Sequence, residues 1–139
     1  MAFALVKINQ GRINQPEPEY LTADATIKKG DALVFGTSTN AGKVVKPGTA
    51  TTKPLFIAMA DGVSGDVIPV CRITPEMLWE TTFNHETSGT AFAHTIGEKA
   101  SLYTDYATIT NTAQNATGVA TVVEVFGTAI GDTVYVRFE

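Results

Sequence analysis

The sequence predicts an all-β protein, a small β-barrel or sandwich made of short strands joined by tight turns. The chain has 139 residues, of which 44% are hydrophobic and 17% are charged, which is enough for one folded domain with a core. It contains 21 threonines, 13 valines and 12 glycines, a composition that favours half-buried pleated surfaces broken by turns. Short runs of alternating side chains recur between Gly-Asp and Pro-Gly turn signals, and no long segment keeps a helical period.

The strands are predicted from runs rich in β-branched and aromatic residues. Along the chain these runs cover residues 32–35, 54–60, 67–73, 77–83, 119–126 and 133–138. In the last run Val134, Val136 and Phe138 point to one face, and the residues between them point to the other. That alternation is typical of a strand with one buried face.

The run around Trp79 allows two interpretations. Residues 74–76, Thr-Pro-Glu, form a good helix start, with a capping hydroxyl and a proline at the first helical position. However, Met77, Trp79 and Phe83 alternate with their neighbours, and Trp-Glu-Thr-Thr-Phe is richer in strand formers than in helix formers. We therefore expect a strand, with Trp79, Met77 and Phe83 in the core or at a seam between subunits.

The chain also resembles itself at a fixed distance. Residues 26–33 resemble residues 95–102, and residues 65–70 resemble residues 131–136, with offsets of 69 and 66. This recurrence predicts two related β units, roughly 24–73 and 93–139, joined by the Trp79 strand and a polar loop at 84–89. The alternative is that strand and turn patterns recur by chance in a β protein.

The first twenty residues are predicted to be an extended N-terminal arm, and residues 21–139 a single β domain. The arm begins with alternating apolar residues, continues with polar ones, and is separated from the body by Pro16 and Pro18. Such an arm can add as a strand to the sheet edge of a neighbouring protein. Alternatively, it is the first strand of the barrel. The residues expected to bind a partner are Phe3, Leu5, Val6, Ile8, Asn9 and Arg12.

No catalytic, metal or cofactor site is predicted. Cys71 is the only cysteine, which excludes an intramolecular disulfide and suits a small buried strand residue. The pair His85-Glu86 and the later His94 match no metal-binding spacing, and no nucleophile or phosphate-binding motif is present. The net charge is −4 and the basic residues are scattered, so nucleic-acid binding is not expected. The apolar start of the chain is too short for a membrane span or a signal peptide.

One arrangement of motifs resembles a known family. Gly30-Asp31-Ala32-Leu33, followed by a threonine-rich turn at 46–52 that runs into the strand at 54–61, is similar to head-decoration (capsid cement) proteins of tailed phages. Lambda-like members carry a similar turn leading into a strand of the pattern glycine-isoleucine-leucine-alanine-valine-alanine. Residues 65–70, the Trp79 strand and residues 132–138 resemble wider families of phage structural proteins.

The resemblance implies a β-tulip-like fold and a role in the virion. It implies a protein that binds the major capsid protein on the outer surface of the head and stabilises the shell, as a homo-oligomer and most simply a trimer. Before assembly such a protein resides in the host cytoplasm. Two other classes remain open: a tail, baseplate or fibre-associated β domain of a phage, and an enzyme or small ligand-binding barrel.

Overall fold

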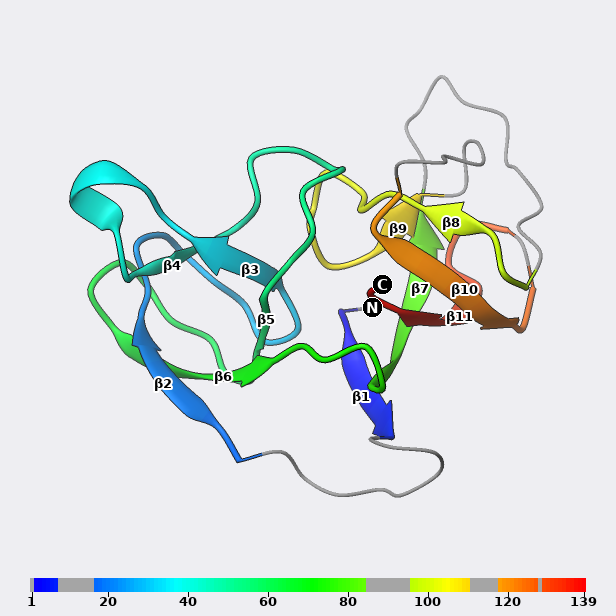
Figure 1. The fold of residues 1–139 in the computed structure, drawn as a ribbon, viewed down its shortest axis with the longest axis horizontal. Coiled ribbons are helices and arrows are strands. Elements are labelled where there is room, and N and C mark those ends of the chain that lie inside the picture. The colour runs from blue at the N-terminus through cyan, green and yellow to red at the C-terminus, as the bar shows by residue number, and fades with distance from the viewer. Residues whose placement is uncertain (1, 8–16, 85–95, 111–117, 128) are drawn as a thin grey trace.

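The structure is a computed structural model that describes residues 2–7, 17–84, 96–110, 118–127 and 129–139. These residues fold into two lobes, each built on one curled sheet, with the two chain ends close together between them (Figure 1). The described part contains one short 3-10 helix, η1 (Ser38–Asn40), and no helix there is long and apolar enough to cross a membrane. The strands are β1 (Ala4–Lys7), β2 (Glu19–Thr22), β3 (Ala32–Phe35), β4 (Val44–Val45), β5 (Phe56–Ala58), β6 (Val67–Arg72), β7 (Leu78–Asn84), β8 (Lys99–Ala100), β9 (Ile109–Thr110), β10 (Ala120–Val125) and β11 (Thr133–Arg137). The predicted all-β fold is confirmed.

The first lobe is a five-stranded sheet in the order β2-β6-β5-β3-β4. Its last strand returns to its first, because Val44 forms a parallel bridge with Ala23 and accepts a hydrogen bond from the Asp24 N–H at 3.0 Å. The sheet therefore closes into a small barrel, which we call the first barrel (residues 19–72). Its interior is apolar and consists of Ala23, Ile27, Leu33, Val44, Phe56, Ala58, Ile68 and Val70.

The second lobe, called the second barrel (residues 78–138), contains strands β7, β11, β10, β8 and β9. It closes in the same way, because β9 pairs in parallel with the end of β7 through Ile109 and Phe83, and Ile109 also bridges Leu102 beyond β8. The second barrel carries one additional strand. This is β1, which pairs antiparallel with β7 and places Ala4 opposite Glu80.

The two barrels pair their strands residue by residue in the same way. Strands β2 to β6 of the first barrel correspond in order to β7, β8, β9, β10 and β11 of the second. The two units expected from the sequence are therefore present, but the Trp79 strand belongs to the second unit and does not link the two. Residue pairs of the first barrel have these counterparts in the second: Tyr20–Pro69 corresponds to Glu80–Tyr135, Ala58–Val70 to Val122–Val136, Ala32–Ile57 to Lys99–Thr121, and Ala23–Val44 to Phe83–Ile109.

Three turns that end in Gly-Asp share one hydrogen-bond pattern, at residues 28–31, 63–66 and 129–132. In each, the aspartate carboxylate accepts the N–H of the first residue at 2.9 Å, and the glycine has a φ between 86° and 95°, a left-handed conformation that suits glycine. The glycine N–H and the aspartate C=O both pair with one residue of the neighbouring strand. Gly97 and Glu98 pair with Val122 in the same way. The repeat around Gly30 is therefore offset by 67 residues, and the offset of 69 predicted from the sequence is wrong.

The barrels pack against each other along one row of the first barrel's outer face. Ala32, Ile57 and Cys71 lie side by side across β3, β5 and β6, and they are buried in the same cluster as Phe138 of the second barrel. The Ala32 N–H also donates to the Tyr106 C=O at 2.8 Å, which joins the backbones of the two barrels. This seam makes the two barrels one packed body.

The N-terminal segment contributes a strand to this body. Residues 4–7 are β1, Phe3 is buried, and its ring meets that of Phe138 edge to face with centroids 5.2 Å apart. The Phe3 N–H donates to the Gly30 C=O of the first barrel at 3.1 Å. The predicted boundary at residue 20 falls inside β2. The N-terminal residues were expected to be either a free arm or the first strand of the barrel. Residues 4–7 are a strand of the body, because their alternating apolar side chains pack on a sheet of the same chain.

Candidate docking surface

The outer edge of β2 has backbone groups that no described strand pairs with. The Ala23 N–H donates to the Asp66 C=O, and the Gly65 N–H donates to the Ala23 C=O, so Ala23 directs its backbone toward β6. The backbone N–H and C=O groups of successive residues in a strand point to alternate edges, so those of Tyr20 and Thr22 point to the edge opposite β6. Pro69, which lies opposite Tyr20, has no N–H to offer, which agrees with this assignment. Among the described residues, strand pairing on that edge begins only at Ala23, with its bridge to Val44.

Exposed apolar side chains lie on β2 at this edge and, on the inner side of β2, on β6 and the turn before it. Tyr20 is 66% exposed, Val67 is 64% exposed and Val63 is 56% exposed. Tyr20 and Val67 lie on the same face of the β2–β6 pair, and Val63 begins the turn that leads into β6. We call the β2 edge and these three side chains the docking surface. It lies on the first barrel, in the lobe that carries β2 and β6 in Figure 1.

An ion pair holds β2 against β6 next to the docking surface. The Arg72 guanidinium donates two hydrogen bonds of 2.8 Å to the two carboxylate oxygens of Glu19. These bonds lower the pKa of the Glu19 carboxyl. The Arg72 guanidinium also lies 4.8 Å from the centre of the Phe56 ring. The pair therefore fixes the start of β2 against β6, on the side away from the outer edge of the strand.

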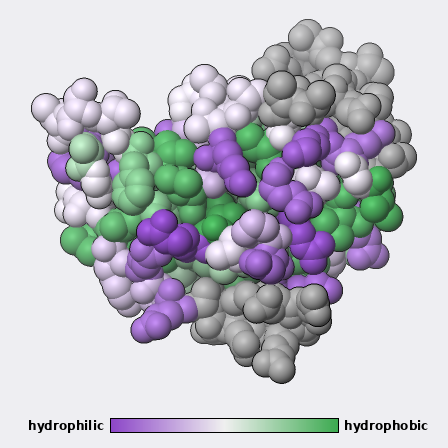
Figure 2. Space-filling view, in the orientation of Figure 1, coloured by the Kyte–Doolittle hydropathy of each residue, from purple (hydrophilic) through white to green (hydrophobic). Residues whose placement is uncertain are grey.

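A second apolar area lies at one end of the first barrel. Figure 2 shows hydrophobic residues gathered over this lobe, around β3 and β5. The exposed large side chains there are Phe35 and Leu55. Phe35 packs edge to face on Phe56, with ring centroids 5.2 Å apart. This contact closes the end of the barrel core, so the area has a structural explanation within the chain.

Of the residues predicted to bind a partner through the arm, the three that the structure describes are packed into the body. Phe3 is buried, Leu5 packs against the core cluster of the second barrel, and Val6 is half-buried in β1. Ile8, Asn9 and Arg12 lie outside the described residues. The exposed Tyr20 is not among the residues predicted to bind a partner, although the Tyr-Leu-Thr run of strand formers indicates a strand at this position.

The residues predicted around Trp79 lie together in one core cluster, with Trp79 and Phe83 on β7 and Met77 just before it. Trp79, Met77 and Phe83 are all buried in the cluster that also contains Phe138. The indole Nε1 of Trp79 is buried and finds no hydrogen-bond partner among the described residues. Strand β7 begins at Leu78, so the strand interpretation of this segment is confirmed and the helix alternative is wrong.

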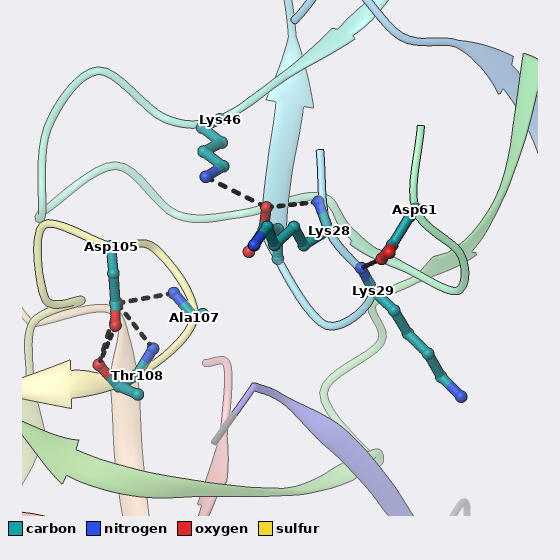
Figure 3. Close-up of polar contacts among 8 residues, drawn as sticks. Lys28, Lys29, Lys46, Asp61, Asp105, Ala107 and Thr108 are labelled. Carbon is teal, nitrogen blue, oxygen red and sulfur yellow. Dashed lines mark hydrogen bonds and ion pairs between the residues drawn. The ribbon is translucent and has the colours of Figure 1, made fainter. Parts of the chain in front are cut away.

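The polar contacts near the seam organise turns (Figure 3). The buried Asp31 carboxylate accepts the Lys28 N–H at 2.9 Å and pairs with the Lys46 ammonium at 3.2 Å. Asp105 accepts the N–H groups of Ala107 and Thr108 at 2.9 and 3.0 Å. Within the described ranges no three His, Cys, Asp or Glu side chains are grouped so that they could hold a metal ion. The candidate metal-binding residues His85, Glu86 and His94 lie outside those ranges.

The described residues thus form a tandem pair of small barrels, one of which has a strand edge that no other described strand covers. No protein-family model matches the sequence, and no curated protein matches it. Among solved structures, the chain is similar to the crystal structure of the head fiber gp8.5 N base of bacteriophage phi29, with a TM-score of 0.58 and 16% sequence identity. The match covers 88% of this chain and 93% of that chain. At this identity the likeness shows a shared fold, and it extends over both barrels.

Proposed function

We propose that this protein is a structural component of a phage head that binds the outer surface of the shell and stabilises it. The observation that carries the proposal is the fold shared with the base of a head fiber over 88% of the chain. The resemblance of the sequence motifs to head-decoration proteins points to the same location. These two lines of support are independent, because one rests on turn and strand motifs and the other on the arrangement of the barrels.

The physical character of the molecule suits a mechanical role. Two closed barrels joined by a buried seam form a rigid body, and a protein that clamps a shell needs rigidity and a binding surface but no catalytic group. The net charge of −4 keeps such a protein soluble before it meets the shell. The role we propose is therefore not enzymatic and uses no cofactor.

The proposed partner is the major capsid protein, and the proposed form is a homo-oligomer, most simply a trimer. A shell presents the same binding site many times at fixed distances. An oligomer that binds several of these sites at once gains avidity even when each contact is weak. The protein would thus be found on the virion, and in the host cytoplasm before assembly.

The test uses virions of the phage whose genome encodes this chain. Immunogold electron microscopy with an antibody against the full chain should label the outside of intact heads, and heads purified without tails should keep the label. Heads made without this protein should lose their cargo at a lower temperature than complete heads. Label confined to tails would contradict the proposal and favour a tail or baseplate component.

A second candidate is the base of a fibre that projects from the head. The observation that favours it is that the similar solved structure is itself the base of a head fiber. Cryo-electron microscopy of the same virions separates the two functions. A fibre extending from the position of this chain supports the second candidate, whereas a compact density on the shell supports decoration.

A further inference from the structure

The duplication of the barrel shows an edge position that β1 fills in the second barrel and that no described strand fills in the first. In the second barrel β1 covers the edge of β7, and it places Ala4 opposite Glu80. The residue that corresponds to Glu80 in the first barrel is Tyr20, because these two lie opposite the matched residues Tyr135 and Pro69. Among the described residues no strand lies beside Tyr20 on that edge.

We infer that the open edge of β2 binds an extended segment of the shell protein as an added antiparallel strand, an inference that rests on the function proposed above. The incoming segment takes the place that β1 occupies on β7. Its backbone pairs with the N–H and C=O of Tyr20, the groups that point away from β6. Backbone pairing of this kind supplies affinity that does not depend on a particular partner sequence.

The side chains around the edge define the chemistry of the segment. Tyr20 is exposed on the outer face of the sheet at this edge, and Val67 lies on the same face one strand further in, so the residues of the added strand that lie beside Tyr20 on that face should be apolar. Glu17 is exposed just before β2, at the end where an antiparallel segment would finish. A basic residue near the end of the segment would complement it. The occupant is therefore an extended segment with alternating apolar residues and a basic end.

The size of the contact favours a shell segment over a second copy of this chain. Strand β2 has four residues and one exposed apolar side chain, Tyr20, while Val63 and Val67 lie on the β6 side. A stable dimer buries about 1,200 Å² or more in total, which a four-residue edge does not approach. A shell compensates for a weak contact by repeating the same segment at many fixed positions. A free second copy offers no such repetition.

Two substitutions at one residue separate the backbone contribution from the side-chain contribution. Tyr20→Pro removes the outward N–H and blocks an approaching strand, but it leaves the hydrogen bonds between β2 and β6 intact, because those are made by the alternate residues. Tyr20→Val is the matched control, since it keeps the N–H and a strand-forming apolar side chain. Each full-length variant is added to heads assembled without this protein, and binding is measured by co-sedimentation over a range of concentrations. Melting temperatures are recorded in parallel.

The expected result is that the wild-type protein and Tyr20→Val sediment with heads, and that Tyr20→Pro binds about tenfold more weakly or worse with a similar melting temperature. Equal binding by all three proteins overturns the added strand and leaves the proposed function standing. Failure of the wild-type protein to bind heads overturns the proposed function itself. If Tyr20→Pro does not fold, hydrogen exchange of the wild-type protein decides: slower exchange at residues 19–22 on heads supports the inference, and unchanged exchange overturns it. A wild-type dimer in analytical ultracentrifugation that Tyr20→Pro abolishes would assign the edge to a second copy and overturn the shell segment.

Discussion

The close approach of Gly30 to the N-terminal segment provides a direct test of how β1 is held between the barrels. A Cβ atom added at Gly30 would meet the Cβ of Ala2 and lie 3.0 Å from the carbonyl oxygen of Phe3. Gly65 and Gly131 occupy the same position in the other two Gly-Asp turns, and a Cβ added there meets nothing within 4 Å. The three glycines have φ values of 89°, 95° and 86°. They therefore differ in their surroundings and not in their backbone conformation.

The expected magnitudes follow from this difference. An alanine in the left-handed region costs about 1 to 2 kcal/mol, and this cost is common to all three sites. At Gly30 the methyl group must also displace the chain at residues 2 and 3, and such overpacking costs about 1 to 3 kcal/mol more. Gly65→Ala and Gly131→Ala should therefore each lower the free energy of unfolding by about 1 to 2 kcal/mol, and Gly30→Ala by about 2 to 5 kcal/mol.

Urea unfolding followed by the fluorescence of Trp79 measures these differences. Trp79 also reports on β1, because Leu5 of β1 lies opposite it in the sheet. Circular dichroism on the same samples checks that the two signals change together. A second substitution, Ala2→Gly, should recover part of the loss in the Gly30→Ala background and little in the Gly65→Ala background. If Gly30→Ala is no more destabilising than its two controls, β1 is not packed against the turn and the N-terminal segment is free of the body.

Four further outcomes are expected. Trp79→Ala should lower the free energy of unfolding by about 3 to 5 kcal/mol, because the side chain is buried in the second barrel, and wild-type emission at the wavelength of free tryptophan would contradict this. Phe3→Ala should cost about 3 kcal/mol by chemical denaturation, and an unchanged midpoint would show that the Phe138 contact does not form. Burial raises the pKa of the Cys71 thiol to about 11, so the native thiol should resist alkylation at pH 8, and stability should fall between about pH 9 and 11, where the unfolded chain ionises first. Arg72 lowers the pKa of Glu19, so the stabilisation from this pair should be present at neutral pH and be lost as the pH falls through that lowered pKa. The variant Glu19→Gln should not show this loss.

Strands with a clear alternation were predictable from the sequence, and strands that close the barrels were not. The last strand was predicted with Val134, Val136 and Phe138 on one face, and all three are buried. Strands β4, β8 and β9 have two residues each, too few to show any period. Their positions depend on parallel bridges and long-range pairing, which residue patterns do not encode locally.

The N-terminal segment shows why the docking surface could not be located from the sequence. An alternating apolar run such as residues 3–6 can add to the sheet of its own chain or to that of a neighbour, and the pattern is the same in both cases. The structure shows the first of these for β1. The edge that no described strand covers lies instead at β2, a four-residue strand that follows two prolines and whose first two residues were assigned to the arm. Only the comparison of the two barrels shows that its edge lacks a partner strand among the described residues.

The difference between the outer faces of the two barrels also explains why a strand could add at the docking surface without disturbing the fold. On the outer face of the first barrel, Ala32, Ile57 and Cys71 face the second barrel, whereas Tyr20 and Val67 face solvent. A strand that adds to β2 thus meets no residue of the seam. In the second barrel the corresponding edge is covered by β1. The turn at Gly30 of the first barrel contacts the residue before β1, because the Gly30 C=O accepts the Phe3 N–H. The duplication therefore leaves one edge that secures the body and one edge that no described strand covers.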